Sequence, residues 1–172
     1  MKILAGIQKL TDIGKSEKEL QSQITVTEVW HLWQTAIQKY DIIELTQILE
    51  NYADDADLRI VLSRGRIALT KERELTERDL KKYGISVPKG SPAFAKTAND
   101  VEPITDDFIF RRVFYGIQAV LPIRMQAFID STSPVLREIF RGHMTKEIEI
   151  YDLLVEYGKL KGYIDVPPAY SL

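Results

Sequence analysis

The sequence contains no cysteine and only two histidines among its 172 residues. Without cysteine, the chain can form neither disulfides nor a zinc site built on thiolates. A ferritin-type di-iron site needs two Glu-x-x-His motifs and would therefore use both histidines. The sequence also lacks a glycine-rich phosphate loop and a Gly-x-Ser-x-Gly nucleophile motif. We assign no catalytic or cofactor-binding residue and expect a protein that is not an enzyme.

Long hydrophobic runs and an excess of one charge are missing as well. The apolar run near the start covers only residues 3–7, which is too short for a signal peptide. No later segment reaches the roughly 18 apolar residues of a membrane span. The net charge of −2 gives no general attraction to nucleic acid or to anionic membranes. We predict a cytoplasmic protein that binds neither nucleic acid nor membrane.

The composition is that of one globular domain. Hydrophobic residues make up 45% of the chain and charged residues 28%, which is typical of a folded protein with a real core. The length fits a single domain, which we predict over residues 24–172. We expect residues 1–23 to form an N-terminal extension that is partly extended or flexible.

Apolar residues recur at helical spacing over residues 25–52 and again over residues 58–75. Thr25 and Glu28 have the capping-box spacing that begins a helix. The acidic stretch "ADDAD" at residues 53–57 separates the two helices and suits the start of the second. This pattern predicts a helical hairpin.

A second hairpin is predicted after residues 86–103, which contain three prolines and no periodicity. Thr105 is the expected cap of the third helix, and Pro122 inside that helix is expected to bend it. Ser133-Pro134 begins the fourth helix, because proline is favoured at the first helical position. Gly162 ends it.

Two stretches of similar sequence, "LKKYGISVPKG" (80–90) and "LKGYIDVPPAY" (160–170), close the two hairpins. In each, we expect glycine to end the helix and the following residues to form an extended tail on the bundle. An up-down bundle needs only a short middle loop, whereas here the middle connection is long. We therefore predict an all-α fold, a ferritin-like four-helix bundle of two helical hairpins with a long crossover between helices 2 and 3.

Three polar residues fall on the predicted apolar stripes of the second and fourth helices: Glu72, His143 and Glu147. His143 and Glu147 are spaced i, i+4 and so share one helix face. Together the three could bind a single divalent metal ion or a small polar ligand. The other interpretation is a hydrogen-bonded polar cluster in or beside the core, with Arg64 or Arg141 nearby.

A full di-iron site is not expected. The match to Glu-x-x-His is Glu28-Val-Trp-His31, and it lies in the first helix, where a lone Glu is required. Glu28 has a capping role instead. Trp30 and Trp33 are predicted to belong to the core.

Three segments carry a resemblance to a known family: "TVTEVWHLW" (25–33), "YGISVPKGSP" (83–92) and "EIYDLLVEYGKLKGYIDVPPAY" (149–170). They are similar to the ferritin-like, function-unassigned family of endospore-forming Firmicutes related to spore coat protein F. The resemblance implies a ferritin-like bundle associated with sporulation, and it brings no catalytic residues with it.

The function predicted from the sequence is a structural protein of the spore coat that acts through self-association. We expect a homodimer, because small bundles commonly pair by two-fold symmetry. Other spore coat proteins are further possible partners. An exposed apolar patch on the aromatic third helix would provide the interface. The alternative is a metal- or small-ligand-binding bundle that uses Glu72, His143 and Glu147.

Overall fold

The computed structural model describes residues 14–89 and 104–164. This part of the chain contains helices and no strand, so the all-α prediction is confirmed. A short helix precedes four long ones: α2 (Glu17–Gln23), α3 (Val26–Tyr52), α4 (Ala56–Lys82), α5 (Asp106–Asp130) and α6 (Pro134–Lys161).

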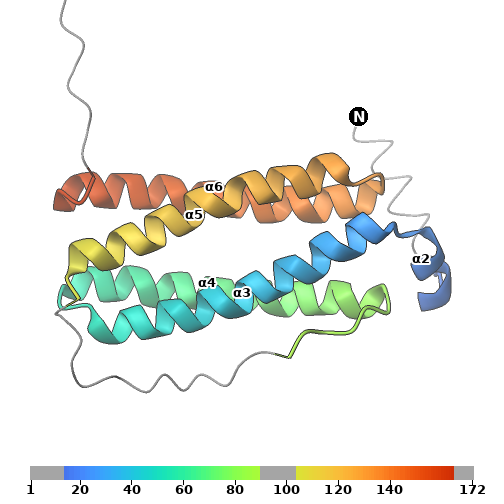
Figure 1. The fold of residues 1–172 in the computed structure, drawn as a ribbon, viewed down its shortest axis with the longest axis horizontal. Coiled ribbons are helices and arrows are strands. Elements are labelled where there is room, and N and C mark those ends of the chain that lie inside the picture. The colour runs from blue at the N-terminus through green and yellow to red at the C-terminus, as the bar shows by residue number, and fades with distance from the viewer. Residues whose placement is uncertain (1–13, 90–103, 165–172) are drawn as a thin grey trace, which may run out of the picture.

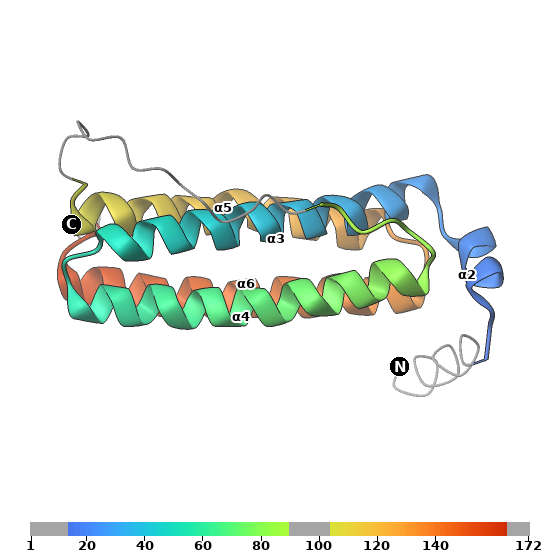
Figure 2. The same ribbon diagram turned by 90° about the horizontal axis from the view of Figure 1, so that it is seen from below.

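The four long helices form an antiparallel bundle of two hairpins, α3/α4 and α5/α6 (Figure 1). Figures 1 and 2 together show a square arrangement of the four long helices. Helices α4 and α5 each lie beside both α3 and α6, and α3 and α6 occupy opposite corners. The end of α4 and the start of α5 lie at opposite ends of the bundle (Figure 1). The predicted ferritin-like bundle with a crossover between its second and third long helices is confirmed.

The capping residues that the sequence predicts are found at the starts of these helices. Thr25 and Glu28 form a complete capping box, in which each side chain binds the backbone amide of the other residue. Thr105 caps α5, and Ser133 caps α6 with Pro134 at its first position. Helix α5 continues through Pro122. The boundaries agree with the predicted ones because capping groups satisfy amides that no helical carbonyl can reach.

The two similar endings adopt the same geometry. Gly84 and Gly162 have positive φ angles of 65° and 72°, which favour glycine. The residue after each glycine donates its amide to a carbonyl five residues earlier, from Ile85 to Leu80 at 2.9 Å and from Tyr163 to Gly158 at 2.8 Å. This is a Schellman motif. The apolar residues that follow pack on the core, as predicted, and the rest of the second tail lies outside the described residues.

Helix α2 was not predicted, because residues 1–23 were expected to form an N-terminal extension that is partly extended or flexible. Ser16 and Glu19 form a capping box that begins this helix. Leu20 is buried and packs against the apolar cluster at the start of α3. With seven residues and one buried side chain, the helix is too short to give a periodic signal.

Some residues of the predicted apolar stripes are exposed, among them Trp30 and Leu75. Trp30 is 55% exposed and Leu75 is 40% exposed. In α4 the buried line runs through residues 72, 76 and 80, so the small Thr76 faces inward and Leu75 turns outward. A period of 3.6 allows both positions on one stripe, and the neighbouring helix decides which of them is covered.

The core is divided into apolar parts at the two ends of the bundle. One end contains Leu32, Leu80, Ala127, Leu136 and Phe140, with one or more residues from each long helix. The other end contains Leu49, Leu58, Ile109, Phe110 and Leu154, again from all four. In every long helix a buried charged residue lies between these two groups. The middle of the bundle is therefore polar.

Candidate functional site

Five buried residues from the four long helices make up this polar centre: Lys39 of α3, Glu72 of α4, Arg124 of α5, and His143 and Glu147 of α6. Each is at least 94% buried as a whole residue. Charged side chains are almost never buried to this extent unless they are paired. The contacts among the five therefore decide what the site can do.

Lys39 and Glu72 form the first ion pair. Lys39 Nζ lies 2.6 Å from Glu72 Oε2, and both side chains are almost inaccessible to solvent. Burial lowers the pKa of Lys39, and the carboxylate of Glu72 opposes that shift. Lys146 Nζ, which is half exposed, lies 3.8 Å from the other oxygen of Glu72. Glu72 is therefore already balanced by cations from two helices.

Arg124 and Glu147 form the second ion pair. Arg124 Nε donates to Glu147 Oε1 at 3.0 Å. Its Nη1 group donates to Thr35 Oγ1 at 3.0 Å and to Gln38 Oε1 at 2.9 Å. Arg124 thus joins α5 to α6 through a charge pair and to α3 through neutral acceptors. The guanidinium suits this role because its planar set of donors can serve several acceptors at once.

His143 lies beside these pairs without joining either. Its Nδ1 is 4.0 Å from Glu72 Oε2, which is too long for a hydrogen bond. Its Nε2 is buried and has no hydrogen-bond partner in the described part of the chain. Burial, followed by the charges of Lys39 and Arg124, lowers the pKa of His143 to about 3. The imidazole is therefore neutral at physiological pH.

The contacts make a ring around the bundle axis. They run from α3 to α4 through Lys39 and Glu72, from α4 to α6 through Glu72 and Lys146, from α6 to α5 through Glu147, and from α5 back to α3 through Arg124. The two carboxylates and two cations cancel, so the centre has no net charge. Such a ring fixes the mutual rotation of four helices.

The three sequence-predicted ligands are all found in this centre, but they do not converge on a common point as a metal ligand set. Glu72 and His143 are neighbours, whereas Glu147 is directed to Arg124. Within residues 14–89 and 104–164, no three His, Asp or Glu side chains are placed to hold an ion. A divalent cation would also have to displace Lys39 and Arg124 from carboxylates they already neutralise. The residues present therefore do not fit a metal ion.

Sequence reasoning missed the two cations, Lys39 and Arg124, and named Arg64 and Arg141 as partners instead. Arg64 and Arg141 are exposed. A signal was available, because Lys39 follows the buried Thr35 and Ala36 by four and three residues. Arg124 precedes the buried Ala127 by three in the same way. A charged residue on an apolar stripe, which singled out Glu72 and Glu147, marks these positions as well.

Comparison with known proteins assigns the chain to a family. The profile of DUF3231, a protein family of unknown function, matches residues 12–171. The chain belongs to DUF3231. The family resemblance read from the sequence motifs is confirmed. No curated protein matches this member of DUF3231.

Two solved structures resemble this DUF3231 chain. One is described as a "putative spore coat protein (BH2358)" from Bacillus halodurans C-125, with a TM-score of 0.76 and 19% identity, covering 86% of this chain and 95% of that one. The other is a two-domain protein containing DJ-1/ThiJ/PfpI-like and ferritin-like domains from Anabaena variabilis ATCC 29413. Its TM-score is 0.65 and its identity 16%, over 93% of this chain and 42% of that one. At these identities the likeness establishes the fold.

Proposed function

We propose that the chain is a structural protein of the bacterial spore that acts through self-association and without catalysis. The basic unit is a homodimer, and other spore coat proteins are its further partners. It is made in the cytoplasm and has the spore coat as its destination. The Bacillus structure supports this proposal through its fold and its description as a spore coat protein. In the described residues, no helix is long and apolar enough to cross a membrane.

The polar centre supports a role without catalysis. Both carboxylates of the centre are paired with cations from neighbouring helices, and none of its five residues is more than 6% exposed. A catalytic group must reach a reacting atom of the substrate. The contacts of the centre instead join each helix to its neighbours, which is a structural task.

One face of α5 carries the self-association proposal. From Val113 to Ile129 the one charged residue is Arg124, and its side chain is buried. The exposed residues on this stretch are uncharged: Tyr115, Gly116, Gln118, Ala119, Pro122, Ile123, Met125, Gln126 and Ile129. We call them the α5 face. Charge depletion together with exposed aromatic and Met side chains is the compositional mark of a protein interface.

The α5 face is also ordered along the helix. Tyr115 and Ile129 of the α5 face lie 14 residues apart and are 54% and 63% exposed. Phe108, which is seven residues before Tyr115 and 39% exposed, extends nearly the same line towards the start of α5. A line of large apolar residues at this spacing is the seam on which a second helix packs. A second copy of the chain fits best, because a two-fold axis places the same uncharged face on both sides. This agrees with the expectation of an apolar patch on the third long helix of the sequence.

Light scattering coupled to gel filtration tests this proposal. We expect the full chain to elute as a dimer and Ile129→Glu to elute as a monomer, because each dimer would then bury charges in an apolar seam. Ile67→Glu on α4 is the matched control, since Ile67 is 49% exposed but lies on another helix. A monomeric wild-type chain at all concentrations, or equal effects of the two substitutions, would contradict the proposal.

A further inference from the structure

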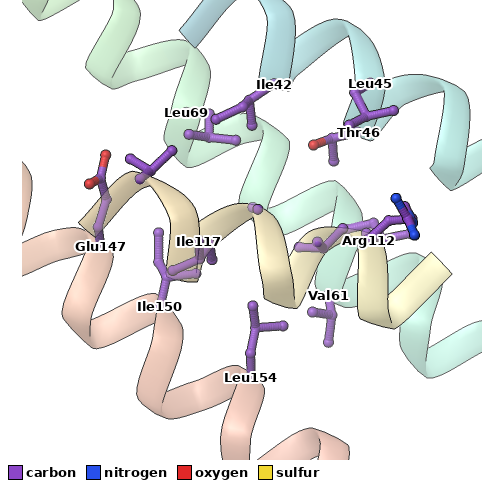
Figure 3. Close-up of a pocket in the computed structure, with 15 residues that line it drawn as sticks. Ile42, Leu45, Thr46, Val61, Leu69, Arg112, Ile117, Glu147, Ile150 and Leu154 are labelled. Atoms are coloured by element: carbon purple, nitrogen blue, oxygen red, sulfur yellow. The ribbon is translucent and has the colours of Figure 1, made fainter. Parts of the chain in front are cut away.

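An apolar cavity of about 110 Å³ lies between the four long helices, on one side of the polar centre (Figure 3). Its walls include Leu45 of α3, Leu69 of α4, Ile117 of α5 and Leu154 of α6. Thr46, Arg112 and Glu147 are the lining residues with polar side chains. Well-packed cores contain few voids larger than a water molecule, and an apolar cavity of roughly 150 Å³ can hold benzene. At about 110 Å³ the space is smaller than that, so it holds part of an apolar ligand, and the rest of the ligand reaches the open mouth.

Two glycines keep this cavity wide. Gly65 and Gly116 line it from the interiors of α4 and α5, where glycine costs a helix about 1 kcal/mol relative to alanine. Neither has a positive φ angle, and a Cβ atom added at either would meet no atom within 4 Å. At Gly158, by contrast, a Cβ atom would come within 2.3 Å of Phe110. Close packing therefore explains Gly158 but does not explain Gly65 or Gly116.

The cavity opens to solvent between α3 and α5. Three of its lining residues are exposed there: Leu45, Arg112 and Gly116. The guanidinium of Arg112 lies over the ring of Phe108, 5.0 Å from its centroid. In the described part of the chain Arg112 forms no ion pair. The mouth of the cavity thus carries a cation that is in no ion pair with the residues that the structure describes.

The other end of the cavity is closed by a carboxylate. Figure 3 shows Glu147 and Arg112 at opposite ends of the lining. The lining runs over eight residues of α5, from Arg112 to Val120, so the cavity is about 12 Å long along the bundle axis. A small volume drawn out over this length is narrow. It suits one unbranched chain, and the buried carboxylate disfavours a second anion at the inner end.

We propose that this cavity binds a single-chain anionic amphiphile, namely a medium-chain fatty acid. The alkyl chain lies between the hairpins among the apolar walls. The carboxylate stays at the mouth, where Arg112 pairs with it through the bidentate geometry that guanidinium and carboxylate share. The ligand therefore enters with its methyl end first, towards Glu147. The mouth of this site borders the α5 face at Gly116, which belongs to both, but the cavity is formed within one chain and does not depend on the proposed self-association.

Calorimetric titration of the full chain with decanoate tests the proposal. We expect saturable binding of one decanoate per chain, and a loss of affinity of about tenfold or more in Gly65→Leu, which fills the cavity. Gly142→Leu is the matched control, because Gly142 is also in a helix interior with open space around it but does not line the cavity. Wild-type protein that shows no saturable binding would overturn the proposal, as would an equal loss in the two variants.

The head group is tested with ligands of the same chain length. Arg112→Gln is expected to weaken decanoate about tenfold while leaving decanol unchanged, since only the ion pair is lost. Tighter binding of decylamine than of decanoate would overturn the orientation, because the head group would then lie at Glu147. A third test is whether the protein sediments together with phosphatidylglycerol vesicles. If the wild-type protein does so and Gly65→Leu does not, the ligand is a membrane lipid, and the proposal of a free fatty acid is overturned.

Discussion

Glu28 and Asp106 have equivalent roles at opposite ends of the bundle. Each lies in the first turn of a hairpin's first helix and binds the turn of the other hairpin. Glu28 Oε1 accepts the backbone amides of residues 132 and 133 at 2.9 and 2.8 Å. Asp106 accepts those of residues 54 and 55, both at 2.8 Å. The two hairpins are thus joined at both ends by acceptors for amides that begin a helix.

Removal of the Glu28 carboxylate is expected to destabilise the protein strongly. Glu28 is 0% exposed, and its Oε1 also accepts from the hydroxyl of Ser131 at 2.8 Å. In Glu28→Ala the buried hydroxyl of Ser131 and the part-buried amides of residues 132 and 133 lose their acceptor, which should cost about 3 kcal/mol or more. The midpoint temperature of thermal unfolding should then fall by about 6–12 °C for a chain of this length. Glu19→Ala is the control, because Glu19 holds the same capping-box position in the exposed helix α2.

Glu28 should also make the stability of the fold depend on pH. Burial alone would raise the pKa of Glu28, but the amides of Ser133 and Thr25 outweigh it and lower the pKa below 4.5. A lowered carboxyl pKa stabilises the fold above the unfolded value, and this stabilisation is lost as the pH falls through the folded value. Urea titrations at pH 6 and pH 3 should show a smaller acid-induced loss in Glu28→Gln than in the wild type. An unchanged loss would contradict this assignment.

The polar centre should respond differently to single and double substitutions. Lys39→Met leaves Glu72 buried without its main cation, and Glu72→Met leaves Lys39 without its anion. Each should cost about 3–5 kcal/mol, whereas the double variant should be about as stable as the wild type, because an apolar pair needs no desolvation of charge. Urea unfolding of all four proteins measures the coupling.

An exposed pair provides the control for this cycle. Arg141 and Glu138 are 2.7 Å apart, but both side chains are about half exposed. Glu138→Met should change the free energy of unfolding by less than about 1 kcal/mol. If Lys39→Met were equally mild, the ring around the bundle axis would have no structural importance, and the proposed role of the centre would be wrong.

The sequence predicts the helices of this protein better than the contacts between them. Thr25, Thr105, Ser133 and Gly162 give the helix boundaries, because caps act within one turn of the chain. The partner of Glu147 could not be predicted in this way. A long cationic side chain on an apolar stripe can reach outward to solvent or inward to a carboxylate. The choice depends on which residues of a neighbouring helix lie at the same level, and periodicity carries no such information.

His143 should make the protein lose stability in a separate pH range. Its folded pKa of about 3 lies below the ordinary value of 6.5, because burial and the nearby cations oppose protonation. The unfolded chain therefore takes up the proton first as the pH falls below 6.5. Stability that is fully present above pH 6.5 declines towards pH 3, whereas the contribution of Glu28 changes only below its ordinary pKa of 4.5. Urea titrations at pH 7 and pH 5 isolate the histidine.

His143→Leu is the variant that tests this range. The substitution removes the buried Nε2 atom that has no partner in the described part of the chain, and it should flatten the change in unfolding free energy between pH 7 and pH 5. It should also leave the protein folded, because leucine is apolar and of similar size. His31→Leu is the control, because His31 is paired with Asp130 at 3.0 Å. Equal flattening in both variants would contradict the role of His143.

Metal content distinguishes the proposed structural role from the metal-binding alternative. Elemental mass spectrometry of the untagged protein, after loading with iron, manganese or zinc and gel filtration, should find far less than one ion per chain. The reason is that Lys39 and Arg124 already occupy the carboxylates on which an ion would depend. One ion per chain in the wild type, lost in His143→Ala and retained in His31→Ala, would instead establish a site at Glu72, His143 and Glu147. The two cations would then have to leave the centre when metal binds, and the ring of contacts would be a metal-free state of a binding protein.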